Sequence, residues 1–194
     1  MEIISRVKNI LVSPKPEWAV IEEESTPHAK LFTTYVLPLA LIPTIAAFIG
    51  YGLIGYSVLG IRVGSLGLGI FQAVVQFITM ALGVYLTAFV INLLAENFGA
   101  KKDLDKAFSL VAHAYTPMFL AGVFYILPSL SWLASLAGLY GLYLLYIGLR
   151  PMMKSPEDKT TTYFVVSLLA MIVVYAVIGA VLGVVLFNAI YTSL

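Results

Sequence analysis

The chain has 194 residues, of which 61% are hydrophobic and only 11% are charged, and its mean hydropathy is +0.98. Soluble domains carry about 25% charged residues, so this composition excludes an ordinary soluble domain. The net charge of +1 excludes a strongly basic protein that binds nucleic acid, and the absence of cysteine excludes disulfides and thiolate sites.

Long uncharged runs predict the architecture. Asp, Glu, Lys and Arg are absent from residues 31–61, 63–95, 107–149 and 160–194. A membrane span needs about 20 apolar residues, and a charge at the bilayer centre costs several kcal/mol. The sequence therefore predicts an all-α, polytopic integral membrane bundle over residues 26–194. Its five transmembrane helices are expected at about 27–53, 70–97, 104–127, 131–150 and 160–187.

Residues 1–25 precede the first span and predict interfacial amphipathic helices on the cytoplasmic side. One helical face carries Ile3, Ile4, Val7, Ile10 and Leu11, with Arg6 and Lys8 mostly opposite. Trp18 is expected to be an interface anchor, and Glu22 to Glu24 a solvated end. These helices are either membrane anchors that order the N-terminus, or a lid over the cytoplasmic mouth of the bundle or a docking face for a partner.

Prolines and glycines divide the apolar runs. Pro38 and Pro43 are expected to kink the first span, and Pro117 the third. The glycine-rich stretch from Gly50 to Gly69, which contains Arg62, is interpreted as an outside loop. Asp103 is the expected N-cap of the third span, and the Pro128 region turns the chain into the fourth.

Positive charge predicts the orientation. Ten of the eleven Lys and Arg residues fall in the N-terminal segment and in the second and fourth loops, and only Arg62 falls on the opposite side. The positive-inside rule then places the N-terminus in the cytoplasm and the C-terminus outside a cytoplasmic (inner) membrane.

Polar side chains inside the bundle form the one candidate site. Gln72, Gln76, Thr79, Gly83 and Thr87 share a face of the second span. Asn92 and Glu96 continue this face, and His113 and Thr116 of the third span are expected near the depth of Asn92. The stripe is either hydrogen-bonding contact between helices or a polar conduit. His113 is likewise either a neutral, internally bonded residue or a functional group.

The remaining signals concern packing and the absence of catalytic sets. Gly179 and Gly183 form a G-x-x-x-G pair in the fifth span, which favours close helix contact within the bundle or between protomers. The sequence has no metal-binding, nucleophilic or phosphate-binding motif, so no catalytic residue, metal or cofactor is expected and the protein is predicted not to be an enzyme.

Several segments resemble the bacterial branch of the Yip (Ypt-interacting protein) family. They are SPKPEW with VIEEE, TYVLPLALIP, LLAENFGAKKDLDKAFSLVAHAYTP and YGLYLLYIGLRPMMKSPEDKTTTY. The resemblance implies a five-span bundle with a cytoplasmic N-terminus. Eukaryotic members are associated with small Rab-type GTPases and membrane traffic. This chain lacks their long cytosolic N-terminal region and its D-L-Y-G-P sequence, which argues against a small GTPase partner.

Two hypotheses of function follow. The first is a non-enzymatic membrane protein of the Yip type that organises the lipid bilayer or partner proteins, with a homo-oligomer or a membrane protein as its partner. The alternative is a transporter or channel for a small solute, ion or lipid that uses the polar face of span two and His113. The alternative predicts a cavity lined by Gln76, Asn92 and His113.

Overall fold

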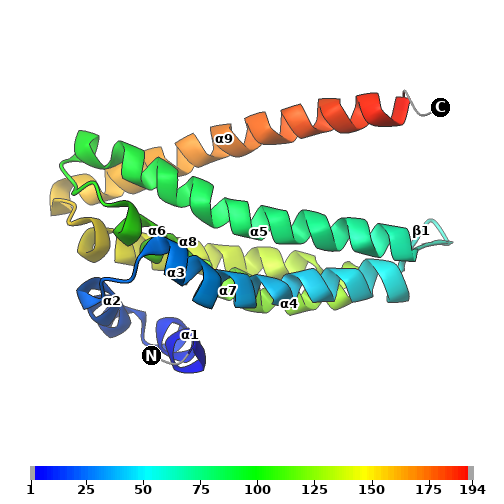
Figure 1. Ribbon diagram of the computed structural model, residues 1–194, viewed down its shortest axis with the longest axis horizontal. Helices are drawn as coiled ribbons and strands as arrows, with labels where there is room; N and C mark the ends of the chain where they lie inside the picture. The colour runs from blue at the N-terminus through cyan, green and yellow to red at the C-terminus, as the bar shows by residue number, and fades with distance from the viewer. Residues whose placement is uncertain (1–2, 192–194) are drawn as a thin grey trace.

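The structure is a computed structural model that describes residues 3–191, with side chains placed through residue 177 except at 58. Five helical segments are long and apolar enough to cross a membrane, which confirms the predicted all-α polytopic bundle. They are His28–Ile54, Leu66–Phe98, Leu104–Ile126, Pro128–Met153 and Glu157–Val177. Figure 1 shows these segments forming the bundle, with the two N-terminal helices beside one end of it.

The N-terminal arm comprises α1 (Ile3–Val12), α2 (Pro14–Glu23) and the segment to Thr26. Ser13 separates the two helices, and Pro14 begins the second, where a missing N–H is tolerated. Both helices pack on the bundle, because Ile10, Trp18 and Ile21 are buried in the common core. The Tyr140 hydroxyl donates to the Leu11 carbonyl at 2.7 Å, which fixes the end of α1 to the fourth span.

The first span departs from α geometry twice. It runs through α3 (His28–Leu31), the π-helix η1 (Phe32–Val36), α4 (Leu37–Ala47) and the π-helix η2 (Phe48–Ile54). Pro38 is the second residue of α4, directly after η1 ends; its ring lacks an N–H and crowds the carbonyl four residues earlier, so the preceding turn widens. Pro43 lies inside α4 and packs against Gly122. A Cβ on this glycine would lie only 2.4 Å from the Pro43 Cβ. The first and third spans therefore meet almost backbone to backbone.

The glycine-rich stretch is less of a loop than the sequence predicts. The first span continues to Ile54, a two-stranded antiparallel hairpin of β1 (Tyr56–Val58) and β2 (Ile61–Val63) follows, and α5 (Leu66–Leu94) begins at once. Gly55, directly before β1, and Gly60, directly before β2, adopt positive φ angles of 72° and 82°. A Cβ on Gly69 would lie 2.5 Å from the Gly52 Cα, so these glycines bring the first two spans into close contact.

The third span is the most enclosed of the five, with 67% of its apolar window buried against 17% for the fifth. The second span ends in η3 (Ala95–Phe98), and Gly99 in the left-handed region turns the chain. Asp103 accepts from the Lys106 N–H at 3.1 Å and begins α6 (Leu104–Ala114), which confirms the predicted N-cap. Tyr115 then separates α6 from α7 (Thr116–Ala121), which has Pro117 in its first turn, and η4 (Gly122–Ile126) completes the span.

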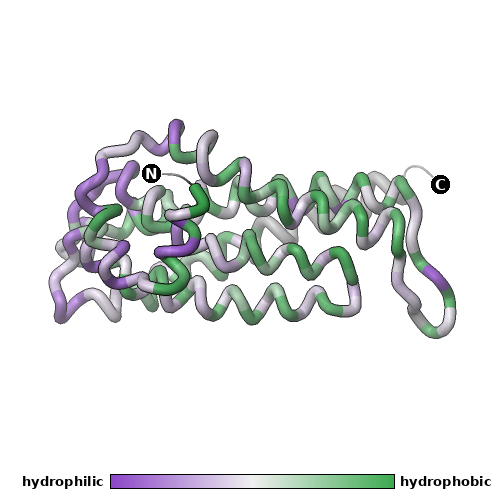
Figure 2. The backbone as a smooth tube through the Cα atoms, turned by 90° about the horizontal axis from the view of Figure 1, so that it is seen from below, coloured by the Kyte–Doolittle hydropathy of each residue, from purple (hydrophilic) through white to green (hydrophobic). Residues whose placement is uncertain are grey.

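The last two spans are more regular. They consist of η5 (Pro128–Leu130) with α8 (Trp132–Met153), and of α9 (Glu157–Tyr191). Lys154 in the left-handed region ends α8. Figure 2 shows that hydrophilic residues gather at the end of the bundle that carries the N-terminal arm, here called the charged end.

Candidate functional site

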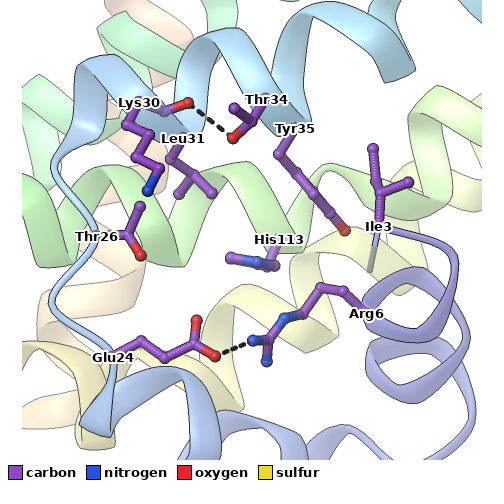
Figure 3. Close-up of a pocket in the computed structure, with 9 residues that line it drawn as sticks. All are labelled: Ile3, Arg6, Glu24, Thr26, Lys30, Leu31, Thr34, Tyr35 and His113. Carbon is purple, nitrogen blue, oxygen red and sulfur yellow. Dashed lines mark hydrogen bonds and ion pairs between the residues drawn. The ribbon is translucent and has the colours of Figure 1, made fainter. Parts of the chain in front are cut away.

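A polar cavity of about 330 Å³ lies at the charged end. It is enclosed by α1, by the segment after α2, by α3 with η1, and by α6 (Figure 3). Its lining residues are Ile3, Arg6, Glu24, Thr26, Lys30, Leu31, Thr34, Tyr35 and His113. No α5 residue belongs to this lining, so the cavity that reaches His113 is not the one expected from the polar stripe of the second span.

Arg6 joins the two helices of the N-terminal arm through buried charge. Its Nη1 lies 2.6 Å from Oε1 of Glu17, and the two side chains are only 5% and 6% exposed. Its Nη2 donates to Glu24, whose carboxylate is 39% exposed and faces the cavity (Figure 3). The expectation that Arg6 lies on a polar outer face and that Glu24 is merely solvated is therefore wrong. A buried guanidinium loses its hydration and requires partners, which the two carboxylates provide.

His113 has a defined orientation at the back of the cavity. Its Nδ1 lies 2.7 Å from the Ser109 carbonyl oxygen, one helical turn earlier. A carbonyl oxygen only accepts, so Nδ1 carries the proton, and in the neutral ring Nε2 is an acceptor. The Tyr35 ring packs on the imidazole with centroids 4.7 Å apart, and Trp18 meets it edge-on at 6.2 Å. The imidazole is thus bonded internally on one side and has one acceptor nitrogen on the other.

Thr116 lies behind Tyr35. The two side-chain oxygens are 2.7 Å apart, and both residues are buried. Thr116 is the first residue of α7, Pro117 follows it, and its hydroxyl meets Tyr35 of the first span. Of the six residues predicted as one polar cluster, His113 and Thr116 therefore share a neighbour, Tyr35.

The other four members of the predicted cluster lie elsewhere. Gln72 and Gln76 are in the first turns of α5, and Asn92 is 16 residues beyond Gln76, about 24 Å along the helix. The side-chain oxygen of Asn92 is buried with no hydrogen-bond partner among the described residues. Glu96 is exposed and lies 4.0 Å from Lys102. The polar face of α5 thus does not combine with His113 into one site.

Trp18 corrects the prediction of an interface anchor. Its side chain is 1% exposed and lies against α8, where a Cβ on Gly148 would be 2.6 Å from the indole ring. The indole Nε1 has no hydrogen-bond partner within the described part of the chain. Trp18 is therefore a core residue that packs α2 against Gly148 of the fourth span. The sequence does not predict this contact, because the two residues are far apart along the chain.

Two lysines hold the acidic end of α2. The Lys106 ammonium donates to the backbone carbonyls of Glu22 and Glu24, the latter at 2.9 Å. The Lys154 Nζ lies 2.5 Å from Oε1 of Glu22. This hydrogen bond, with the charges of both lysines, lowers the pKa of the Glu22 carboxyl below its ordinary 4.5. The N-terminal arm is thus bound to the first turn of α6 and to the end of α8.

Sequence reasoning missed Arg6, Glu17 and Tyr35 as members of the site. The pairs they form join residues 11 or more positions apart, and no periodicity reports such pairs. Among the described residues, no three His, Cys, Asp or Glu side chains are close enough to bind a metal ion. The predicted packing pair Gly179 and Gly183 lies in the part of α9 whose surroundings are outside the described residues.

The fold and the site define a polytopic helical membrane protein whose charged end is covered by its own N-terminal arm. The chain belongs to the Yip1 domain family, whose model matches residues 8–192. It is also 31% identical over 134 residues to the inner membrane protein YohC of Escherichia coli K12, which covers 68% of each chain. YohC of Escherichia coli O6:H1 matches over the same length with the same identity. No solved structure is similar to this chain.

Proposed function

We propose that the protein is a non-enzymatic inner-membrane protein that organises lipid or partner proteins through its charged end. The observation that carries the proposal is the N-terminal arm, which is held over this end by the Arg6–Glu17 and Arg6–Glu24 pairs and by Lys106. A preformed surface of this kind suits recognition, because its charges are already ordered before a partner arrives. The relatives named as inner membrane proteins support the same location.

The orientation proposed here follows the positive-inside rule. The arm and the loops around Lys102 and Lys154 lie together at the charged end, so this end faces the cytoplasm. The hairpin with Arg62 lies at the opposite end and faces outward. The organising surface is therefore presented to cytoplasmic partners and to the inner leaflet.

The chemistry of the cavity supports a non-enzymatic role. Glu24 is paired with Arg6, His113 is bonded to its own helix, and the Tyr35 hydroxyl is bonded to Thr116. No nucleophile and base lie within hydrogen-bonding distance of each other in the cavity lining. This arrangement favours binding over group transfer.

A transporter is the second candidate, favoured only by the cavity that reaches His113. Native mass spectrometry after gentle extraction separates the two. The organising role predicts a stable homo-oligomer or a co-extracted membrane protein, retained in His113→Ala. A monomer that carries a small solute or ion, lost in His113→Ala, contradicts the organising role and supports transport.

A further inference from the structure

We infer that the cavity at the charged end binds a phosphate ester carrying a primary ammonium group, with the headgroup of a phosphatidylethanolamine of the inner leaflet as its source. This inference deepens the proposed function by naming a ligand of the same surface, and it rests on the orientation proposed there. It is carried by the position of the cavity, by the two signs of charge in its lining and by the acceptor nitrogen of His113.

The cavity lies at the depth of lipid headgroups. Lys30, Leu31 and Tyr35 belong to the first two turns of the first span, and Lys30 and Tyr35 differ in depth by about 7.5 Å. Beside them lies α1, whose outward face carries Ile4 and Val12 at 75% and 73% exposure. Such exposed apolar side chains on an amphipathic helix are typical of a helix in the interfacial plane. A ligand of the cavity is therefore adjacent to the lipid surface.

Charges of both signs enter the cavity. Lys30 reaches in from α3, and Glu24 and Arg6 enter from the opposite side, with His113 between them (Figure 3). The Lys30 ammonium makes no ion pair among the described residues, and Thr26 lies beside it (Figure 3). An ammonium with a neighbouring hydroxyl is a suitable donor set for a phosphate group.

The opposite side suits a cation with hydrogen-bond donors. Arg6 is shared between Glu17 and Glu24, so one positive charge faces two negative ones. The partly exposed Glu24 carboxylate and the Nε2 of His113 are acceptors, and the Tyr35 ring adjoins the imidazole. A primary ammonium has three donors for such acceptors and is attracted by an aromatic face. A purely anionic ligand would instead meet Glu24, and a purely cationic one Lys30.

The apolar residues of the lining complete the fit. Ile3 and Leu31 border the cavity, and farther along the first span Leu41 and Ile45 are 47% and 55% exposed. A phosphate ester held at Lys30 thus has an apolar path for acyl chains along this span. This continuity favours a lipid over a soluble phosphate ester, although both carry the same recognised groups.

Native mass spectrometry of the full chain, exchanged into micelles with equal amounts of phosphatidylethanolamine, phosphatidylglycerol and phosphatidylcholine, tests the inference. We expect phosphatidylethanolamine to remain bound preferentially, and Lys30→Gln to lower its occupancy by roughly tenfold. Lys8→Gln is the matched control, since it removes the same charge from an exposed site outside the cavity. Glu24→Gln is expected to abolish the preference over phosphatidylglycerol while lipid still binds.

Equal retention of the three lipids, or equal losses in Lys30→Gln and Lys8→Gln, would overturn the inference. If millimolar phosphoethanolamine displaces the lipid, the cavity does bind a phosphate ester with a primary ammonium group, but its ligand is a soluble ester and the lipid source is wrong. The oligomeric state in the same spectra reports on the organising role separately. Loss of lipid preference in an intact oligomer contradicts only the site, and a selectively bound lipid on a monomer contradicts only the organising role.

Discussion

At the scale of single residues, Gly148 determines whether Trp18 can be buried. A Cβ at this position would lie within 2.7 Å of the indole ring and of Leu110. Gly148→Ala should therefore destabilise the protein by about 1–3 kcal/mol, despite the higher helix propensity of alanine. Thermal unfolding in detergent measures the change. Gly138→Ala on the same helix is the control, because its Cβ would have its nearest neighbour at 4.0 Å; an equal effect of both variants would contradict the packing argument.

Arg6 gives a second prediction at this scale. Arg6→Met leaves the Glu17 carboxylate buried without its partner, which typically costs about 3–5 kcal/mol. Since the chain has no cysteine, Ile10→Cys is a specific reporter of the buried face of α1. Arg6→Met should raise its maleimide labelling rate at least tenfold, and adding Glu17→Met should reverse most of this rise. Lys8→Met should leave the rate unchanged. Slow labelling in Arg6→Met would show that the pair does not hold the arm.

At the scale of elements, the end of α2 is held by two lysines in unequal ways. Lys106 donates to two backbone carbonyls, whereas Lys154, which is itself exposed, meets one partly exposed carboxylate. With Ile21→Cys as the reporter, Lys106→Met should raise labelling roughly tenfold, because two charged hydrogen bonds to partly buried backbone are the stronger contribution. Lys154→Met should change it less than a few-fold. The reverse order would contradict this assignment.

The Glu22 carboxyl adds a pH dependence to the same element. Its pKa is lowered in the folded arm, so its contact with Lys154 stabilises the arm above pH 4.5 and is lost as the pH falls through the lowered value. In Lys154→Met the Glu22 pKa should rise toward 4.5, which a carboxyl-resolved NMR titration measures. An unchanged pKa would show that Lys154 is not its main partner in solution.

The elements also show how far the sequence predicts the structure. The five spans can be predicted from the long uncharged runs, and the N-cap at Asp103 from the residue type at the start of a helix. Both depend only on residues that are close in the sequence. The candidate site could not be predicted in this way. A helical repeat shows which residues share a face of a helix, but not which other helix packs against that face. His113 packs against Trp18 of α2 and Tyr35 of the first span, while the Asn92 oxygen has no hydrogen-bond partner among the described residues. Arg6 meets its carboxylates only when α1 and α2 fold together.

At the scale of the whole molecule, the distribution of charge predicts the orientation of the bundle in the membrane. Ten of eleven Lys and Arg residues belong to the charged end, and such an asymmetry over short loops fixes topology during insertion. Leu59, 98% exposed at the tip of the hairpin, and Lys102, in the loop before α6, are the two exposed positions that separate the two orientations.

Single cysteines at these positions test the orientation in intact cells. A membrane-impermeant maleimide should label Leu59→Cys directly and Lys102→Cys only after the membrane is permeabilised. The reverse pattern would place the N-terminal arm and its cavity on the outer side, which would exclude cytoplasmic partners for the arm. Because Arg62 is the only basic residue at the hairpin end, Arg62→Gln should leave the pattern unchanged. Replacing the three lysines of the second loop by Gln should weaken it, since these lysines are three of the ten basic residues on which the predicted orientation rests.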